Sequence, residues 1–427
     1  AGIDLFLEKL VQETEKEHED ILEQADETDA MFGELYSWYL RNPEYRSRVQ
    51  KLVQSAFAGK PKDIISQSVA KALYGEVSPY SATRLERFAA CAFAHFLQYG
   101  MKLTERVEYE FKPMDMGNVM HEALESFAEE VRKRGMKWTE LTEQERNEIA
   151  DRCLDNIVAD YGNTVLKSSA RNEYMIERTR RILRRTVWAL QKQLEQGEFQ
   201  PEGFEVTFGG GRIDRVDIME DQNKVYVKVI DYKTGNTSFD LVYLYHGLQL
   251  QLMIYLDGAL RVEQKKYPDK EIIPAGVFYY NIKDPMIQEK IDADVEAVSA
   301  GLMKELKMNG LVQADPELVY RMDSSLGSIP VAFNKDGNFR KNSSVADRTQ
   351  FAVLGRYVRT KIEKIRSSIL EGDAEVSPYE LGKKNACTYC PYMTVCGFDR
   401  RLSGYEFRRL KNFSDEELWK AFDREAE

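Results

Sequence analysis

Residues 203–232 alternate apolar and polar side chains with period two on both sides of a polar Asp221-Gln222-Asn223 turn. Successive side chains of a β-strand point to opposite faces of a sheet, so this pattern predicts a β-hairpin. The alternation also tells which side chains share a face. On the second strand one face carries Val225, Val227, Val229, Asp231 and Lys233.

A carboxylate and an ammonium group therefore lie side by side at the end of this strand, in Asp231 and Lys233. On the first strand, Asp214 and Asp217 fall on opposite faces. Asp214 is the expected partner of Asp231 across the hairpin, because it shares its face with the apolar side chains that follow it at every second position.

These residues have the chemistry of a metal-dependent hydrolase. Asp214, Asp231 and the backbone carbonyl of Tyr232 offer oxygen ligands of the kind that Mg²⁺ prefers. A bound Mg²⁺ lowers the pKa of water and withdraws charge from a phosphodiester, and Lys233 would orient the attacking water. The alternative for a lone Asp-x-Lys pair is an ion pair on the surface at a strand end.

Two flanking segments supply further candidates. GNVMHEAL places His121 on a predicted helix before the hairpin, where a neutral imidazole would complete the coordination of a metal. After the hairpin, Gln251 and Tyr255 stand four residues apart on one face of a predicted helix, within reach of DNA or Lys233. The alternatives are a packed or solvated histidine and a tyrosine that faces the core.

The rest of the chain is mainly helical. Periodicity predicts helices over residues 78–100, 117–133, 171–196, 244–260 and 347–370, a strand over 275–282, and helices without strands in residues 1–75. In the helix at 78–100, Thr83 and Glu86 are spaced as a capping box, and Cys91 falls on the apolar face.

The composition excludes some classes of protein. Because 60 Lys and Arg face 71 Asp and Glu, the net charge of -11 argues against a chain that coats nucleic acid over its whole surface. Arginines crowd residues 178–185, where they either line a DNA channel or form a solvated helix face. The sequence has no phosphate-binding GxxxxGK[S/T] loop, no apolar run that would span a membrane, and no signal peptide at its start, so we expect a cytoplasmic location without ATP hydrolysis.

Three of the five cysteines, Cys387, Cys390 and Cys396, fall within ten positions near the end of the chain. In a reducing compartment a group of this kind favours metal or cluster ligation over disulfides. Thiolates suit either Zn²⁺ or an iron-sulfur cluster, and the group of three lacks a fourth ligand close by in the sequence.

Taken in order, GxxxHxxL, GxID, DYKTG and QxxxY resemble the motifs of the RecB-like branch of the PD-(D/E)XK nucleases. The resemblance implies an α/β fold with a mixed central sheet flanked by helices. It also implies metal binding by His121, Asp214 and Asp231, catalysis by Lys233, and a supporting role for Gln251 and Tyr255. In iron-sulfur members of the branch one cysteine before the histidine motif joins three near the C terminus, which assigns Cys91 as the fourth ligand of a [4Fe-4S] cluster.

The flanking sequence, including SPYSATRLERFAACAFAHFLQYGMKL and CTYCPYMTVCGFDRRLSGYEFRRL, is similar to the B subunits of bacterial AddAB-type helicase-nucleases. This similarity implies a nuclease domain over residues 76–427, and residues 1–75 as the helical end of a helicase-like domain. It implies a heterodimer with an AddA-type motor subunit that processes double-strand breaks, in which this subunit cuts the 5′-terminated strand. The alternatives are a shorter iron-sulfur nuclease of CRISPR adaptation, a silent DNA-binding scaffold, and a zinc-stabilised interaction module.

Overall fold

The computed structural model describes residues 27–56, 64–75, 81–104, 113–160, 169–209, 211–287, 294–402 and 404–426. The chain forms two compact units, each assembled from separate stretches of sequence. One unit comprises residues 1–76, 87–104 and 367–412, and the other comprises residues 77–86, 105–366 and 413–427. The large central sheet belongs to the second unit.

That sheet has six strands in the order β1-β2-β3-β4-β5-β6. The strands are β1 (Gln200–Phe208), β2 (Gly211–Asp221), β3 (Lys224–Lys233), β4 (Glu271–Asn281), β5 (Asn309–Gln313) and β6 (Val345–Ala346). β1, β2 and β3 are antiparallel neighbours, β3 and β4 are parallel, β4 and β5 are antiparallel, and β5 and β6 are parallel. The sheet is therefore mixed, and the parallel β3–β4 step requires a crossover, which contains helices.

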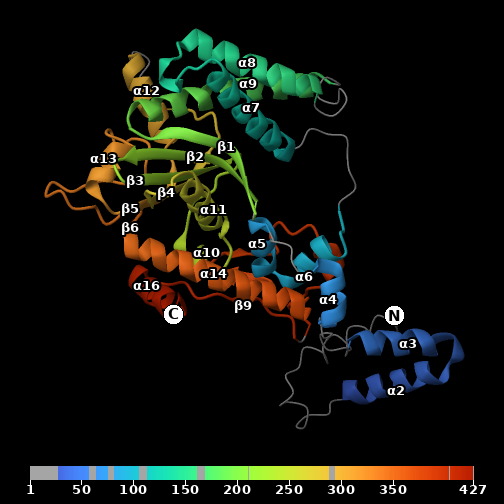
Figure 1. Cartoon of the computed structure of the whole chain (residues 1–427). Helices are drawn as coiled ribbons and strands as arrows, with labels where there is room; N and C mark the ends of the chain where they lie inside the picture. Colours follow the sequence, from blue (N-terminus) through green and yellow to red (C-terminus); the bar gives the residue numbers. More distant parts are fainter. Residues whose placement is uncertain are drawn as a thin grey trace. The chain divides into compact units, whose positions relative to one another are not determined.

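Helices cover both faces of the sheet (Figure 1). One face is packed by α7 (Pro113–Lys133), α8 (Glu143–Asp160) and α9 (Ala170–Glu195), which bury Leu124, Phe127, Leu183 and Leu190 in a core with Phe278 and Tyr280 of β4. On the opposite face lies α11 (Gln251–Lys266), the main helix of the β3–β4 crossover. The second unit also contains α10 (Leu241–Tyr245), α12 (Val295–Glu305), α13 (Pro316–Met322), α16 (Asp415–Ala426) and most of α14 (Arg348–Glu371).

The face of the sheet under α7–α9 contains a buried charged network. Asp217, which is fully buried, accepts hydrogen bonds from Arg215 at 2.6 and 2.9 Å and lies 2.9 Å from Lys228 Nζ. The Arg215 guanidinium lies over the rings of Trp138 and Phe204, 5.7 and 5.6 Å from their centroids. These ion pairs hold the pKa of the Asp217 carboxyl below its ordinary value, against the effect of burial.

The hairpin predicted around residues 221–223 is confirmed as β2 and β3, and β1 extends it to three antiparallel strands. The helices predicted at 117–133, 171–196 and 347–370 correspond to α7, α9 and α14, and the strand at 275–282 to β4. The helix predicted at 244–260 is confirmed from Gln251 onward as α11, but its start is wrong. The chain forms α10 and then α11, because Gly247 between them takes a left-handed φ of 79° that ends the first helix.

The first described residues of the other unit form helices, namely α2 (Glu27–Arg41), α3 (Pro43–Ala56) and α4 (Gln67–Tyr74). The early residues 1–26 and 57–63 lie outside the described part of the chain. The assignment of residues 1–75 to a helicase-like domain stays a prediction. Later stretches of this unit add α6 (Ala92–His95), a π-helix (Phe96–Gly100), α15 (Met393–Cys396) and a small sheet of β7 (Tyr379–Leu381), β8 (Lys384–Asn385) and β9 (Arg408–Arg409).

The continuous helix predicted over residues 78–100 is wrong. The chain forms α5 (Ala82–Ala90), interrupts the helix at Cys91, which is extended at φ -165° and ψ 118°, and then starts α6. The capping box predicted from Thr83 and Glu86 is also wrong. Ser81 supplies the hydroxyl that accepts from the Arg84 N–H, at 3.4 Å. None of the described helices combines the length and the apolar composition that crossing a bilayer requires.

Candidate active site and thiol cluster

The predicted catalytic residues meet at one end of the β2–β3 hairpin. Arg215 pairs with Ile230 in the strand register, so the next residues, Asp214 and Asp231, oppose each other on the other face of the sheet. Asp214 accepts a hydrogen bond from the backbone N–H of Tyr232, at 2.7 Å. The two carboxylates are thus held side by side by the strands themselves.

Lys233 extends this group towards solvent. Its Nζ lies 2.7 Å from Asp231 Oδ2, in an ion pair. The side chain of Asp231 is almost fully buried, whereas that of Lys233 is 28% exposed. An ammonium group is therefore available at the mouth of the site, beside a carboxylate at its floor.

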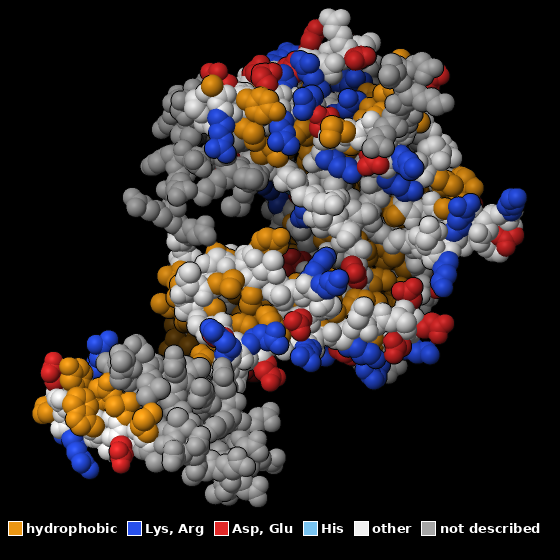
Figure 2. Space-filling model, turned by 180° about the vertical axis from the view of Figure 1, so that it is seen from behind, with side chains coloured by type: hydrophobic (Ala, Val, Ile, Leu, Met, Phe, Trp, Pro, Cys, Tyr) orange, Lys and Arg blue, Asp and Glu red, His pale blue; other side chains and the backbone are white. Residues whose placement is uncertain are grey.

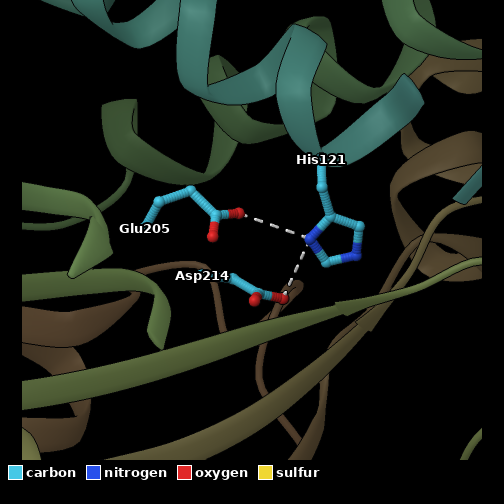
Figure 3. Close-up of side chains that lie close together, drawn as sticks. All are labelled: His121, Glu205 and Asp214. Atoms are coloured by element: carbon cyan, nitrogen blue, oxygen red, sulfur yellow. Dashed lines mark ion pairs between the residues drawn. The ribbon is translucent and has the colours of Figure 1, made fainter. Parts of the chain in front are cut away.

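His121 enters the site from α7 (Figure 3). Its Nε2 lies 3.1 Å from the carbonyl oxygen of Tyr232, and its Nδ1 lies 3.4 Å from Asp214 Oδ2. When Nε2 donates its proton to that carbonyl, Nδ1 keeps a lone pair that points at the carboxylates. The Tyr232 carbonyl, predicted as a metal ligand, is thus within hydrogen-bond distance of His121.

Glu205 is a member of this site that the sequence did not reveal. It lies on β1, and its Oε1 is 3.5 Å from His121 Nδ1 (Figure 3). The backbone of Glu205 has a left-handed φ of 48°, which breaks the alternation of β1 and turns the carboxylate to His121 and Asp214. Arg212 Nε holds the other oxygen of Glu205 at 2.5 Å.

Burial and mutual repulsion make it unfavourable for both carboxyl groups of this site, those of Asp214 and Asp231, to be ionised. Burial, and then the charge of Asp231, raise the pKa of Asp214 to about 7. Burial likewise raises the pKa of Asp231, and the Lys233 ammonium opposes that rise. Burial lowers the pKa of His121, but Glu205 and Asp214 outweigh it, so the net shift is upward. Such a site gains by binding a cation.

Gln251 and Tyr255 lie on the first turns of α11, next to Lys233. The Lys233 ammonium donates to Gln251 Oε1 at 2.7 Å, and Gln251 Nε2 donates to the Tyr255 hydroxyl at 2.9 Å. Burial raises the pKa of Tyr255, so its hydroxyl is neutral at neutral pH. Gln251 therefore orients Lys233, and Tyr255 orients Gln251.

The donor set fits a divalent cation. Among the described residues, His121, Glu205 and Asp214 are the group of three such side chains whose ligand atoms all lie within 4.8 Å of one another. Carboxylate oxygens with one imidazole suit Mg²⁺ or Mn²⁺ better than Zn²⁺ or copper, which favour sulfur and nitrogen. Asp231 adds a further carboxylate next to Asp214.

In the other unit, the thiols of Cys91, Cys387, Cys390 and Cys396 line a single apolar pocket. The extended backbone at Cys91 allows its thiol to enter this pocket, together with Phe93, Tyr392 and Phe398. Burial, and then the three neighbouring thiols, raise the pKa of Cys387 to about 12, a cost that a bound cation removes. Cys153 lies elsewhere, in the core formed by α7, α8 and α9.

Four thiolates around one pocket suit either Zn²⁺ or an iron-sulfur cluster, so both interpretations of this site stay open.

Four arginines of α9 are paired with acidic side chains. The pairs are Arg180 with Asp151, Asp155 and Glu177, Arg184 with Asp151, and Arg181 and Arg185 with Asp284. On the face drawn in Figure 2, basic and acidic side chains are interspersed among the coloured residues. The solvated-face interpretation of this helix therefore fits better than a DNA channel.

Comparison with known proteins agrees with this geometry. The family model described as the PD-(D/E)XK nuclease superfamily matches residues 79–397. The chain belongs to the PD-(D/E)XK nuclease superfamily. Its mixed sheet, flanked by helices, is the nuclease fold of that superfamily, as the sequence motifs predicted.

Similar curated relatives include proteins of Lachnoclostridium phytofermentans, 41% identical over 94% of this chain, and of Clostridium acetobutylicum, 33% identical over 93%. A protein of Thermoanaerobacter sp. is 34% identical over 94% of the chain. Each carries the name of the B subunit of an ATP-dependent helicase/deoxyribonuclease. The chain spans little more than a third of the length of these relatives, between 36% and 37%.

Proposed function

We propose that this nuclease domain hydrolyses DNA phosphodiesters with Mg²⁺, at the site formed by Asp214, Asp231, His121 and Lys233. The observation that carries the proposal is the meeting of these residues from β2, β3 and α7 at the end of one hairpin, together with Glu205. All the groups that metal-dependent hydrolysis needs are present, which disfavours a silent DNA-binding scaffold.

The residues divide into those that hold a cation and those that act on water. Asp214, Glu205 and His121 Nδ1, with Asp231 beside them, would hold Mg²⁺. When bound, Mg²⁺ supplies charge that stabilises the phosphodiester transition state and acidifies water. Lys233, held by Gln251 at 2.7 Å, orients the attacking water and balances the developing negative charge.

The likeness to proteins named as part of an ATP-dependent helicase/deoxyribonuclease supports a role within a helicase-nuclease complex. We propose DNA ends as the substrate, an AddA-type motor subunit as the partner, and exonucleolytic cutting of the 5′-terminated strand during break repair in the cytoplasm. A CRISPR adaptation nuclease is disfavoured, because the likeness covers 94% of this chain.

We also propose that Cys91, Cys387, Cys390 and Cys396 hold a [4Fe-4S] cluster. Their shared apolar pocket supports this assignment. When bound, the cluster supplies a covalent link between sequence stretches that lie on either side of the nuclease core. Cys153 has no part in it.

The decisive experiment is DNA cleavage by purified Asp231→Ala protein in Mg²⁺, assembled with the partner subunit and compared with wild type. End-labelled linear DNA shows which strand is cut. We expect the cleavage rate of Asp231→Ala to fall at least about a hundredfold, because the carboxylate beside the Mg²⁺ that acidifies water is lost. Asp336→Ala, at an exposed turn in the same unit, should cleave normally. Cleavage by Asp231→Ala at the wild-type rate would falsify the assignment of the site.

A further inference from the structure

The helix that carries Gln251 and Tyr255 begins without a cap of its own. Leu250 occupies the N-cap position of α11 and cannot accept a hydrogen bond through its side chain. The first backbone N–H groups of a helix have no partner within the helix, and near a buried site they need one. In this structure the partner comes from a residue more than 160 positions earlier in the chain.

That residue is Glu86 of α5. Its Oε1 accepts from the backbone N–H of Leu250 at 2.7 Å and from that of Gln251 at 2.9 Å. Both contacts lie within the unit that contains the central sheet. A carboxylate at this place also faces the positive end of the α11 dipole, which favours a negative charge.

Gln251 is the first residue of α11, so Glu86 holds the backbone of the residue whose side chain orients the Lys233 ammonium. Gln251 Oε1 in turn accepts from the Lys233 ammonium at 2.7 Å, and Lys233 Nζ lies 2.7 Å from Asp231 Oδ2. The amide nitrogen of Gln251, Nε2, donates to the Tyr255 hydroxyl. Any shift of the first turn of α11 therefore moves the ammonium group relative to the carboxylates.

Glu86 is also close enough to the site to share its electrostatics. Burial is the main cause that raises the pKa of Glu86 to about 7, and the charge of Asp231 adds to it. The two backbone N–H groups and the Lys233 ammonium oppose the rise. Keeping a carboxyl group in such surroundings costs stability, whereas a neutral capping residue on α11 itself would not.

We propose that Glu86 is a positioning residue for DNA cleavage, which fixes the start of α11 and, through Gln251, the place of the Lys233 ammonium. The inference rests on the proposed function of the site. This role of Glu86 depends on the length of its side chain (its reach) and on a hydrogen-bond acceptor at the end of that side chain, more than on its negative charge. Reach and charge are separable by substitution.

Two substitutions separate them. Glu86→Gln keeps the reach and an acceptor oxygen but loses the charge, whereas Glu86→Asp keeps the charge and shortens the side chain by one methylene. We expect Glu86→Gln to keep kcat within about threefold of wild type, and Glu86→Asp to lower kcat about 10- to 100-fold, because displacement of a catalytic group by about 1 Å has effects of that size. KM for DNA should change less than about threefold in both, because Glu86 is proposed to act on the backbone of α11 and not on DNA.

A double-mutant cycle tests whether Glu86 acts through Gln251. We expect Glu86→Asp combined with Gln251→Ala to have the same kcat as Gln251→Ala alone, since both changes interrupt the same chain of contacts from Glu86 through Gln251 to Lys233. Asp315→Ala serves as the matched control. Asp315 caps α13 in the same unit, where it accepts from the N–H groups of Glu317 and Leu318, so its loss should lower the melting temperature and leave kcat unchanged.

Three outcomes would overturn the inference: kcat of Glu86→Asp equal to that of wild type, a larger loss in Glu86→Gln than in Glu86→Asp, or multiplicative losses in the double mutant. Asp231→Ala is measured alongside. If Asp231→Ala cleaves DNA normally, the proposed site itself fails. If Asp231→Ala is inactive while Glu86→Asp is fully active, only the role of Glu86 fails.

Discussion

Replacing Asp214 by Asn should make the metal-free protein more stable while it abolishes cleavage. Asp214 is 7% exposed, and its pKa rises from an ordinary 3.8 to about 7 through burial and the charge of Asp231. A carboxyl whose pKa is raised in the folded state opposes folding when it is ionised. The destabilisation is complete above about pH 7, and it fades as the pH falls from there towards the ordinary value near 4.

The size of this effect follows from the shift. Each pKa unit corresponds to about 1.4 kcal/mol, so a rise from 3.8 to about 7 corresponds to at most about 4 kcal/mol at pH 8. Asn loses the ionisable group but keeps an oxygen that accepts from the Tyr232 N–H, which Asp214 binds at 2.7 Å. We therefore expect Asp214→Asn to unfold at a higher temperature than wild type at pH 8 in a chelator.

The assay is thermal unfolding at pH 8 and pH 5.5, in EDTA and in Mg²⁺. The advantage of Asp214→Asn should shrink at pH 5.5, and Mg²⁺ should stabilise wild type but not the variant. Asp217→Asn is the matched control, three residues along the same strand. It leaves the buried charges of Arg215 and Lys228 unpaired and should cost about 3–5 kcal/mol. If Asp214→Asn is less stable than wild type at pH 8 in EDTA, the reasoning is refuted.

Three further predictions concern the cofactors. The Mg²⁺ concentration needed for cleavage should rise at least about tenfold for each pH unit below 7, since the metal must displace a proton from Asp214 and one from His121, whose pKa is also raised; Mg²⁺ titrations at several pH values check this. His121→Ala should raise the Mg²⁺ requirement of cleavage more than it weakens DNA binding, and an unchanged requirement would exclude His121 as a ligand. Cys91→Ala should lose iron and sulfide whereas Cys153→Ala keeps both, as elemental analysis per chain will tell.

The parts of the site that depend on local periodicity could be predicted from the sequence. Alternation in β2 and β3 correctly separated Asp214 from Asp217, because the faces of a strand follow directly from residue parity. Helical spacing likewise placed Gln251 and Tyr255 together, and the structure adds their contact with Lys233. The order of the motifs was enough to predict the superfamily and its fold.

The parts that depend on tertiary structure could not be predicted. Glu205 enters the site through a left-handed φ in the middle of a strand, and strand periodicity does not predict such a conformation for a glutamate. Glu86 matched a local capping pattern three residues after Thr83, whereas its real partners lie in α11. The helix break at Cys91 could not be predicted either, because it depends on tertiary structure. An apolar helical pattern does not show that the backbone turns extended at Cys91, where the residue joins a pocket with Cys387, Cys390 and Cys396.

The buried ion pairs beneath the sheet have a consequence for how the hairpin finds its alignment during folding. Asp217 and Lys228 are direct cross-strand neighbours, and they lie on the face opposite to Asp214 and Asp231. If β2 and β3 paired one residue out of step, Asp217 and Lys228 would turn to opposite faces. Asp217 would keep Arg215 of its own strand, but Lys228 would be buried without its partner. An unpaired buried charge costs several kcal/mol, so a core closed over the misaligned hairpin is less stable than the native one. The ion pairs on one face of the hairpin therefore favour the alignment that places Asp214 and Asp231, the two carboxylates of the proposed active site, opposite each other on the other face.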